Sequence, residues 1–298
     1  MKIDLHVHTD ASDGKESVET VFARAASLGL DAIAISDHDT TANWGRAKEL
    51  AFQHGMGFVP AIEVTTRAHF VKGDEPAAKF GVHMLAYLPD PTNAALVERM
   101  RQTIEGRELR LREIAERLGP KYGITWQSVL DQVVGDATLG RPAVADALIA
   151  AGHFENRGQV FDQVWFKGSP YYVPNRAVPD TIDAIELIRA AGGVPVIAHP
   201  LSRVKDRDAL GEKPLLHFEA MIEAGLGGVE AFHREVEESD REWLLNLAER
   251  HDLIVTGSSD YHGVAGKKNE LGENTTTPEN LARIIEQASG AEVVNLSL

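Results

Sequence analysis

The sequence predicts an α/β protein built as a closed barrel of parallel strands with helices between them. Seven short apolar segments alternate with helical segments over most of the chain, a pattern typical of a parallel sheet covered by helices. Histidine and acidic residues recur at or just past the C-terminal ends of these segments. Such ends form the active-site face of a βα barrel, whereas an open doubly wound sheet gathers its chemistry at one switch point. The pattern therefore favours the barrel.

The predicted elements follow from hydrophobic spacing and from glycine, proline and capping signals. Strands are predicted at residues 2–8, 31–36, 58–65, 81–87, 194–199, 227–232 and 253–258. Helices of the barrel are predicted at residues 17–28, 43–53, 181–191, 214–224, 239–250 and 278–288. The segment 67–79 is polar and contains glycine and proline, so it is predicted to be an exposed loop.

The alternation stops between residues 93 and 177, where only helical patterns occur. These patterns cover residues 96–118, 126–134, 141–151 and 156–164. We therefore predict a barrel formed by residues 1–92 and 178–298, with residues 93–177 inserted into it as a helical subdomain.

Composition narrows the classes of function. The chain has 298 residues, of which 43% are hydrophobic, enough for one large domain or two modest ones. It contains no apolar run of membrane-spanning length and begins without a secretory signal pattern, which predicts a soluble cytoplasmic protein. Its net charge of −15 argues against a stable nucleic-acid complex, because such binding needs Lys and Arg to neutralise phosphates. Cysteine is absent, so any metal must bind His, Asp and Glu, which suits Mn, Fe or Zn.

The first forty residues contain two patterns of metal-ligand residues. His6 and His8 share one face of the first predicted strand, because side chains alternate along a strand. Asp13 follows shortly after, and Asp37 and His38 close the second strand. A His-x-His pair alone can equally be a solvated strand edge or a hydrogen-bonded core pair. The repetition of such residues at later strand ends favours a metal site.

Nine side chains at these positions are candidate metal ligands: His6, His8, Asp13, His38, Glu63, His83, His199, Asp260 and His262. This number exceeds the needs of one ion and predicts a cluster of two to three divalent ions. Mn²⁺ is the first choice, with Fe²⁺ or Zn²⁺ as alternatives. Closely spaced ions clamp phosphoryl oxygens and lower the pKa of water, which provides a hydroxide nucleophile near neutral pH.

Four segments resemble the motifs of the PHP (polymerase and histidinol phosphatase) family. They are Asp4-Leu5-His6-Val7-His8-Thr9, Ser36-Asp37-His38-Asp39, Ala198-His199-Pro200 and Ser259-Asp260-Tyr261-His262-Gly263. The similarity covers approximately residues 1–90 and 180–265, with all four motifs in order. The resemblance implies a distorted seven-stranded βα barrel with a trinuclear metal site that hydrolyses phosphoesters. It implies one ion on His6, His8, Glu63 and Asp260, a second on Glu63, His83 and His199, and a third on Asp13, His38 and His262.

Two motifs in the helical region resemble the stand-alone phosphoesterase branch of this family: Gly140-Arg141-Pro142 and Tyr172-Val173-Pro174. Members of that branch remove the 3′-phosphate of 3′,5′-bisphosphonucleosides, and some trim short oligoribonucleotides from the 5′ end. The resemblance implies that the helical subdomain caps the substrate and that Arg141 holds phosphate over the metal face. The alternative for Arg141 is an exposed arginine at a helix start. The chain departs from the branch pattern at Ala143, where histidine is common, and at Asn175.

Four further site residues are predicted. Arg203, which follows the Ala-His-Pro motif, is expected to be a second phosphate contact, and Asn175 to contact substrate. His233 matches a family histidine at a strand end and is expected to meet the leaving group or phosphate. Asp37, beside His38, is expected either to orient a metal ligand or to transfer a proton.

The resulting hypothesis is a metal-dependent phosphoesterase that acts on a small phosphorylated nucleotide, the 3′-phosphate of a nucleoside 3′,5′-bisphosphate. A histidinol-phosphate or other sugar-phosphate phosphatase stays open as an alternative because of Ala143 and Asn175. An alternative from another class is a non-catalytic domain that binds a nucleotide or a partner, which the complete ligand set disfavours. A processive nuclease is disfavoured because the acidic chain has no evident basic track.

Overall fold

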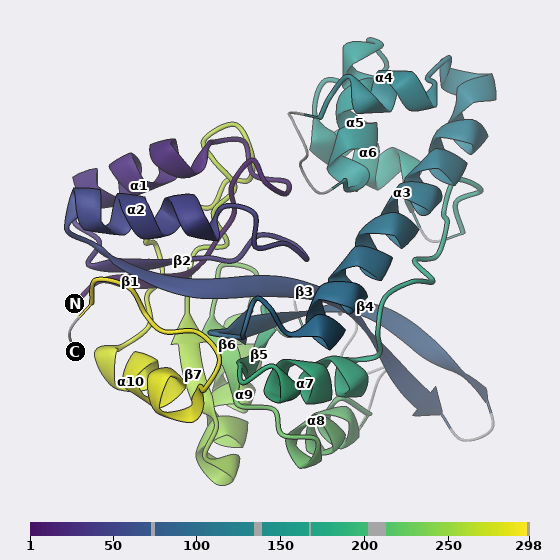
Figure 1. Ribbon diagram of the computed structural model, residues 1–298. Helices are drawn as coiled ribbons and strands as arrows, with labels where there is room; N and C mark the ends of the chain where they lie inside the picture. Colours follow the sequence, from purple (N-terminus) through teal and green to yellow (C-terminus); the bar gives the residue numbers. More distant parts are fainter. Residues whose placement is uncertain (73–74, 134–138, 167, 202–212, 297–298) are drawn as a thin grey trace.

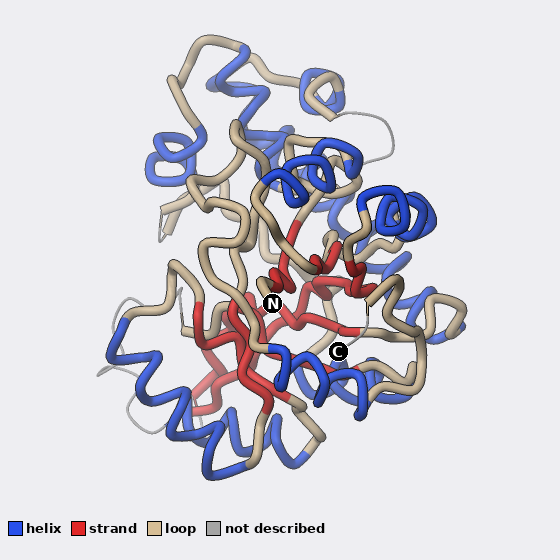
Figure 2. The backbone as a smooth tube through the Cα atoms, turned by 90° about the vertical axis from the view of Figure 1, so that its left-hand side faces the viewer, coloured by secondary structure: helices blue, strands red, loops and turns tan. Residues whose placement is uncertain are grey.

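The protein is a seven-stranded barrel surrounded by helices. The computed structural model describes residues 1–72, 75–133, 139–166, 168–201 and 213–296. Its strands are β1 (Ile3–Val7), β2 (Ala32–Ile35), β3 (Gly57–Lys72), β4 (Glu75–Tyr87), β5 (Val194–Ala198), β6 (Gly228–Phe232) and β7 (Ile254–Gly257). They neighbour one another in sequence order, and Figure 2 shows them gathered in the interior with helices around them. The predicted barrel is confirmed.

The barrel closes between its first and last strands. Val7 forms a parallel bridge with Tyr261, just past β7, and the His8 N–H donates to the Tyr261 carbonyl at 2.9 Å. Closure therefore occurs where β1 and β7 end. It brings the motif residues at the two ends of the chain together.

Alternate residues of the strands pack into different hydrophobic clusters. Ala32 and Ala34 of β2 lie in a cluster with Ala61 of β3. Ile33 and Ile35 lie instead in the cluster that contains Phe22, from helix α1 (Val18–Ser27). Strands buried on both faces read as continuous apolar runs. For this reason the sequence located β2 without any alternation of polar and apolar residues.

The barrel departs from a fully parallel architecture at β4, so the prediction of parallel strands is wrong there. β4 runs antiparallel to both β3 and β5. The predicted loop at residues 67–79 is also wrong, because β3 extends to Lys72 and β4 starts at Glu75. Paired strands satisfy their backbone polar groups whatever their side chains are, so a polar sequence with glycine and proline can still form a hairpin.

The barrel helices agree with the predicted segments to within one or two residues. Besides α1 they are α2 (Trp44–His54), α7 (Thr181–Ala190), α8 (Lys213–Glu223), α9 (Glu238–His251) and α10 (Pro278–Gln287). A side-chain cap marks the start of α1, where the Ser17 hydroxyl accepts from the Thr20 N–H. Gly55 ends α2 with φ 63°, a conformation that costs glycine little. None of the described helices has both the length and the apolar character needed to cross a membrane.

A helical region separates β4 from α7. It contains α3 (Ala94–Tyr122), α4 (Trp126–Leu130), α5 (Arg141–Ala150) and α6 (Arg157–Val164). Figure 1 shows α3 rising from the barrel beside β4 to reach α4, α5 and α6. The four helices share a hydrophobic cluster that includes Leu118, Val129, Leu148 and Val160. The region thus has its own core, although its role as a separate capping subdomain stays a prediction.

Glycine at position 106 allows α3 to pack closely against the segment that returns to the barrel. A Cβ at Gly106 would lie 2.0 Å from the Ala177 Cβ. Replacing Gly106 by alanine is therefore expected to lower the free energy of unfolding by about 1–3 kcal/mol, as overpacking does elsewhere. Urea-induced unfolding measures the change.

Gly45→Ala in α2 is the matched control, because a Cβ at this position meets nothing within 4 Å. This substitution should leave the free energy of unfolding unchanged or raise it by up to about 1 kcal/mol. Equal stability of the two variants would contradict the packing argument.

Candidate metal centre

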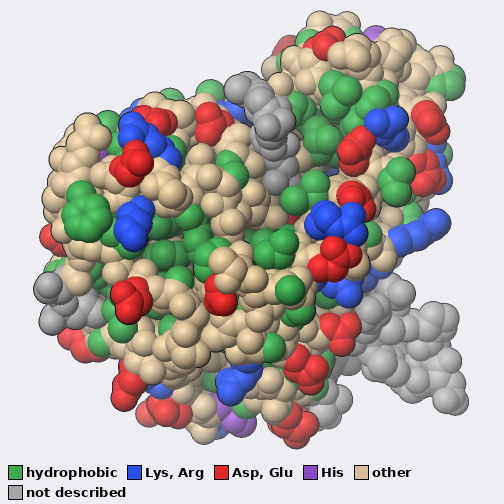
Figure 3. Space-filling model, in the orientation of Figure 1, with side chains coloured by type: hydrophobic (Ala, Val, Ile, Leu, Met, Phe, Trp, Pro, Cys, Tyr) green, Lys and Arg blue, Asp and Glu red, His purple; other side chains and the backbone are tan. Residues whose placement is uncertain are grey.

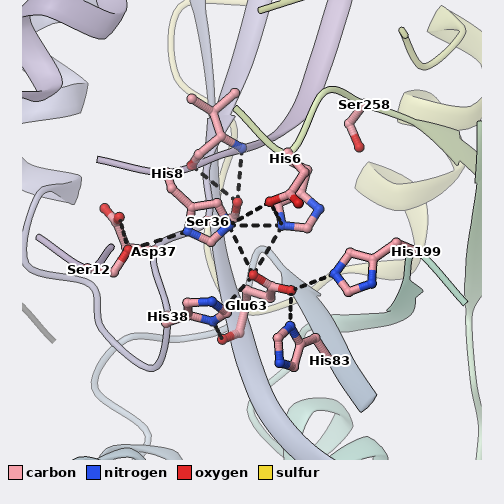
Figure 4. A network of polar contacts seen from close by, with 12 residues as sticks. His6, His8, Ser12, Ser36, Asp37, His38, Glu63, His83, His199 and Ser258 are labelled. Carbon is pink, nitrogen blue, oxygen red and sulfur yellow. Dashed lines mark hydrogen bonds and ion pairs between the residues drawn. The ribbon is translucent and has the colours of Figure 1, made fainter. Parts of the chain in front are cut away.

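The predicted ligand residues converge on one carboxylate, Glu63 of β3. His6 lies in β1 and His8 just after it, while His38 follows β2. Figure 4 shows the imidazoles of His6, His8, His38, His83 and His199 grouped around Glu63. His83 reaches this level from the middle of β4, where it pairs with Thr65 and Ala198. The antiparallel strand β4 thus contributes a candidate ligand from its middle, whereas the parallel strands contribute theirs from their C-terminal ends.

Four buried residues form one group: His6, His8, Glu63 and Asp260, whose ligand atoms all lie within 4.8 Å of one another. The Nε2 atoms of His6 and His8 are 3.2 and 3.0 Å from Glu63 Oε2. They are 3.5 and 3.3 Å from Asp260 Oδ1. These residues are the first predicted ligand set, and the fold brings them together from both ends of the chain.

Two further groups adjoin the first. His83 Nδ1 and His199 Nε2 lie 2.6 and 3.2 Å from Glu63 Oε1, so the second oxygen of Glu63 faces a different pair of imidazoles. Asp13 Oδ1 lies 3.1 Å from His262 Nε2, and Asp13 Oδ2 lies 3.9 Å from His38 Nε2. All nine predicted ligand residues therefore occupy one connected cluster.

The donor atoms suit divalent cations. His6 Nδ1 faces Glu230 Oε1 at 3.0 Å and His8 Nδ1 faces the Ser12 hydroxyl at 3.3 Å, so in the neutral rings each Nδ1 donates and each Nε2 keeps its lone pair. These two Nε2 atoms are 3.0 Å apart. Four buried atoms of the cluster and its surroundings have no hydrogen-bond partner: Asp13 Oδ1, His233 Nε2, Asp260 Oδ1 and His262 Nε2. Buried polar atoms are normally satisfied, and ions would satisfy the atoms of Asp13, Asp260 and His262. His233 Nδ1 accepts from the Glu235 N–H, so its Nε2 carries the proton and is not a ligand atom.

The electrostatics of the cluster agree with this fit. Burial would raise the pKa of Glu63, but His38 and His83 outweigh it and hold that pKa well below its usual value. Burial opposes the charged form of His8, yet Asp260 and Glu63 raise its pKa to about 9, so a metal ion that binds this imidazole would displace a proton from it. Burial lowers the pKa of His38 well below its usual value, which keeps its imidazole neutral and able to ligate a metal. The carboxylates are thus ionised and attract positive charge.

Backbone strain accompanies the cluster. Asp39, His199 and Asp260 have φ angles of 53°, 29° and 53°, in the left-handed region that side chains disfavour. Each of these residues is a predicted ligand or follows one directly. Non-glycine residues held in this region concentrate at functional sites, where surrounding structure enforces the geometry.

Glu230 supports the cluster and was not found by sequence reasoning. It is fully buried in β6, where Oε1 accepts from His6 Nδ1 and from the Ser258 hydroxyl. Its Oε2 accepts from the His199 backbone N–H at 2.7 Å. A carboxylate that holds the second nitrogen of a ligand histidine fixes the orientation of the ring. The signal was a charged residue inside an otherwise apolar strand.

Asp37 and His233 lie behind the cluster. The Asp37 carboxylate accepts from the Thr9 N–H, the Thr9 hydroxyl and the Ser12 hydroxyl at 2.8, 2.6 and 2.6 Å. It thereby shapes the loop after His8, which favours the orienting role over proton transfer. His233 is also fully buried, with Nε2 3.6 Å from Asp260 Oδ2. This position favours contact with Asp260 over contact with substrate.

A cavity of about 700 Å³ opens in front of the cluster. Its barrel side includes Asp13, His38, Glu63, His83 and His199, and its opposite side includes Arg141 and Asn175 from the helical region. The Arg141 guanidinium lies over the rings of Phe161 and Trp165, at 5.3 and 5.8 Å from their centres. Arg203 lies outside the described residues.

The comparisons with known proteins agree with this geometry. The family model described as the PHP domain matches residues 4–106. A solved structure from Bifidobacterium adolescentis, assigned as a metal-dependent phosphoesterase, is 39% identical with a TM-score of 0.85, over 96% of each chain. The chain belongs to the PHP domain family. This PHP protein is a metal-dependent phosphoesterase.

Two curated relatives of this PHP enzyme act on RNA or on nucleotides according to their names. A 5′-3′ exoribonuclease of Salmonella typhimurium is 31% identical over 264 residues, which cover 87% of this chain and 84% of the relative. A 3′,5′-nucleoside bisphosphate phosphatase of Chromobacterium violaceum is 28% identical over 278 residues, which cover 93% and 92%. Both relatives thus align over most of their length.

Proposed function

We propose that this PHP enzyme removes the 3′-phosphate from a nucleoside 3′,5′-bisphosphate. The observation that carries the proposal is the shared cavity. It places candidate metal ligands on one side and the Arg141 guanidinium and Asn175 amide on the other. A small substrate with a phosphate at one end and polar groups at the other suits such a site. The bisphosphate phosphatase among the relatives supports the same substrate class.

Two or three divalent ions on the nine ligand residues would polarise the phosphoryl oxygens and lower the pKa of water in the site. Glu63 would hold two of them, because its two carboxylate oxygens face different imidazole pairs. Glu230 and Asp37 would keep His6 and the loop after His8 in place. The residues around the ions thus determine where the phosphate is held relative to them.

Arg141 and Asn175 would bind the substrate. The rings of Phe161 and Trp165 restrict the Arg141 guanidinium, and a guanidinium presents two parallel donors to phosphate oxygens. Asn175 Oδ1 is buried without a hydrogen-bond partner, so this amide can bind a hydroxyl or amino group of the nucleoside. Arg141 would stabilise the charge that builds on the phosphoryl group, and Asn175 would orient the nucleoside.

A phosphate-release screen tests the proposed substrate. Purified metal-loaded enzyme is given nucleoside 3′,5′-bisphosphate, nucleoside monophosphates, histidinol phosphate and short RNA in parallel. We expect the bisphosphate to have the highest kcat/KM and the products to be inorganic phosphate and a nucleoside 5′-monophosphate. Chelation of divalent ions should abolish release, and added Mn²⁺ should restore it.

Other outcomes of the screen would favour the alternatives. Preference for histidinol phosphate would replace the proposed substrate by a sugar-phosphate-like one. Faster release of nucleotides from the 5′ end of RNA would favour the activity named for the Salmonella typhimurium relative. Equal and weak activity on every compound would overturn the substrate class.

A further inference from the structure

Three arginines converge on one part of the cavity, apart from Arg141. Arg67 lies on β3 four residues beyond Glu63, so the two side chains leave the same face of the strand. Arg107 and Arg110 are three residues apart on α3 and share a face of that helix. All three line the cavity. We name Arg67, Arg107 and Arg110 the arginine cluster.

Arg107 alone of the arginine cluster is neutralised by a carboxylate. Its guanidinium binds Asp39 Oδ2 at 2.6 Å and also contacts the Thr65 hydroxyl. This pairing ties α3 to residues that directly neighbour the metal ligands, and it gives Arg107 a structural role. No comparable pairing with a carboxylate gives Arg67 or Arg110 a structural role among the described residues.

The charges of Arg67 and Arg110 have no carboxylate partner in the part of the chain that the structure describes. Arg110 donates through Nε to the Val173 carbonyl at 2.7 Å, which leaves its two terminal nitrogens available. Burial, together with repulsion from Arg107 and Arg67, lowers the pKa of Arg110 to about 10 even though Tyr172 opposes the shift. Such a cluster is costly without an anion.

The arginines on the outer face of α3 differ from Arg67 and Arg110 because they have acidic partners. Arg101, Arg112 and Arg117 each pair with a glutamate on α3, and Figure 3 shows red and blue side chains interspersed over this face. The chain has a net charge of −15. On α3, by contrast, Arg110 lines the cavity without a carboxylate partner among the described residues, and a ligand can supply the negative charge there.

We propose that Arg67 and Arg110, held in place beside Arg107, form a second phosphate subsite that binds the 5′-phosphate of the substrate. Guanidinium groups suit phosphate because they donate two parallel hydrogen bonds. The Cα atoms of Glu63 and Arg67 are four positions apart on β3, roughly 13 Å, so the arginine cluster lies beyond the metal ligands along the strand. The nature of the ligand rests on the proposed function, whereas the anion site itself does not.

Kinetics on a matched substrate pair test the subsite. Nucleoside 3′,5′-bisphosphate and nucleoside 3′-monophosphate differ only in the 5′-phosphate. The double variant Arg67→Gln/Arg110→Gln should raise KM for the bisphosphate by at least about tenfold, the effect of losing charge-assisted hydrogen bonds. KM for the monophosphate, kcat for both substrates and metal content should stay near the wild-type values. Arg101→Gln removes the same charge from an exposed position on α3 and should leave all of them unchanged.

A binding measurement separates this proposal from the proposed function. Calorimetry compares a nucleoside 5′-monophosphate with the unphosphorylated nucleoside on metal-loaded protein. The wild type should prefer the phosphorylated compound and the double variant should lose that preference, whether or not any 3′-phosphate is hydrolysed. If the double variant keeps the wild-type preference, the subsite is refuted. If the wild type hydrolyses no 3′-phosphate but the preference disappears in the variant, only the proposed function fails.

Discussion

Alanine at both His6 and Asp260 is expected to abolish phosphate release and to remove bound metal. The two residues belong to the group whose ligand atoms lie within 4.8 Å of one another, and their loss would leave only His8 and Glu63 there. A divalent ion held by two protein ligands in place of four would lose most of its affinity. Phosphate release should fall by at least about a thousandfold, because the ions supply the nucleophile and charge neutralisation. Elemental analysis of the purified protein would report the loss of metal separately.

The control for this variant removes a histidine and an acid elsewhere. Glu249→Ala/His251→Ala changes two exposed residues at the end of α9 and should leave metal content and turnover unchanged. Cooperative urea-induced unfolding of both double variants would show that each is folded. Near-normal phosphatase activity in the His6/Asp260 variant would refute the assignment of the first metal group.

Glutamine at position 230 is expected to weaken metal binding without removing any ligand. Glu230 holds His6 Nδ1 and the His199 backbone N–H, and His6 lowers the pKa of Glu230 to about 2 against the effect of burial. The neutral amide would hold both residues less firmly, so metal affinity should fall by about 10- to 100-fold, as for comparable groups behind metal ligands. Competition with a chelator would measure this affinity.

Saturating metal distinguishes a positioning role of Glu230 from a general loss of structure. Excess Mn²⁺ should restore most of the phosphate release of Glu230→Gln, since the substrate-facing residues are intact. The exposed variant Glu249→Gln should show wild-type metal affinity. Unchanged chelator competition in Glu230→Gln would show that this carboxylate does not support the metal ligands.

The success of the sequence prediction has an identifiable cause. Strands such as β2 are apolar on both faces, and their C-terminal ends carry short polar motifs that need no distant partner to be recognised. Because neighbouring strands in a barrel end at the same face, residues such as His38 and His199 could be expected near one another. The predicted loop and strand direction were wrong at the β3–β4 hairpin, where no local apolar pattern marks the paired ends of the strands.

The supporting residues could not be assigned in the same way. Glu230 was visible as a charge within an apolar strand, but its partners His6 and Ser258 are distant in sequence and depend on barrel closure. The arginines of α3 look alike in sequence, since most positions of that helix are polar. Only the folded structure separates Arg110, which lines the cavity, from Arg101, which pairs with glutamates outside.

The sequence by itself determined the barrel, the nine candidate ligands and the chemistry they imply, because apolar periodicity and donor type are local properties of the chain. The tertiary structure decided which candidate ligands lie within 4.8 Å of one another and that His83 reaches the cluster from an antiparallel strand. It also decided which charges lack a partner. Those facts depend on distances between residues such as His6 and Asp260, which are set only when β1 and β7 close the barrel.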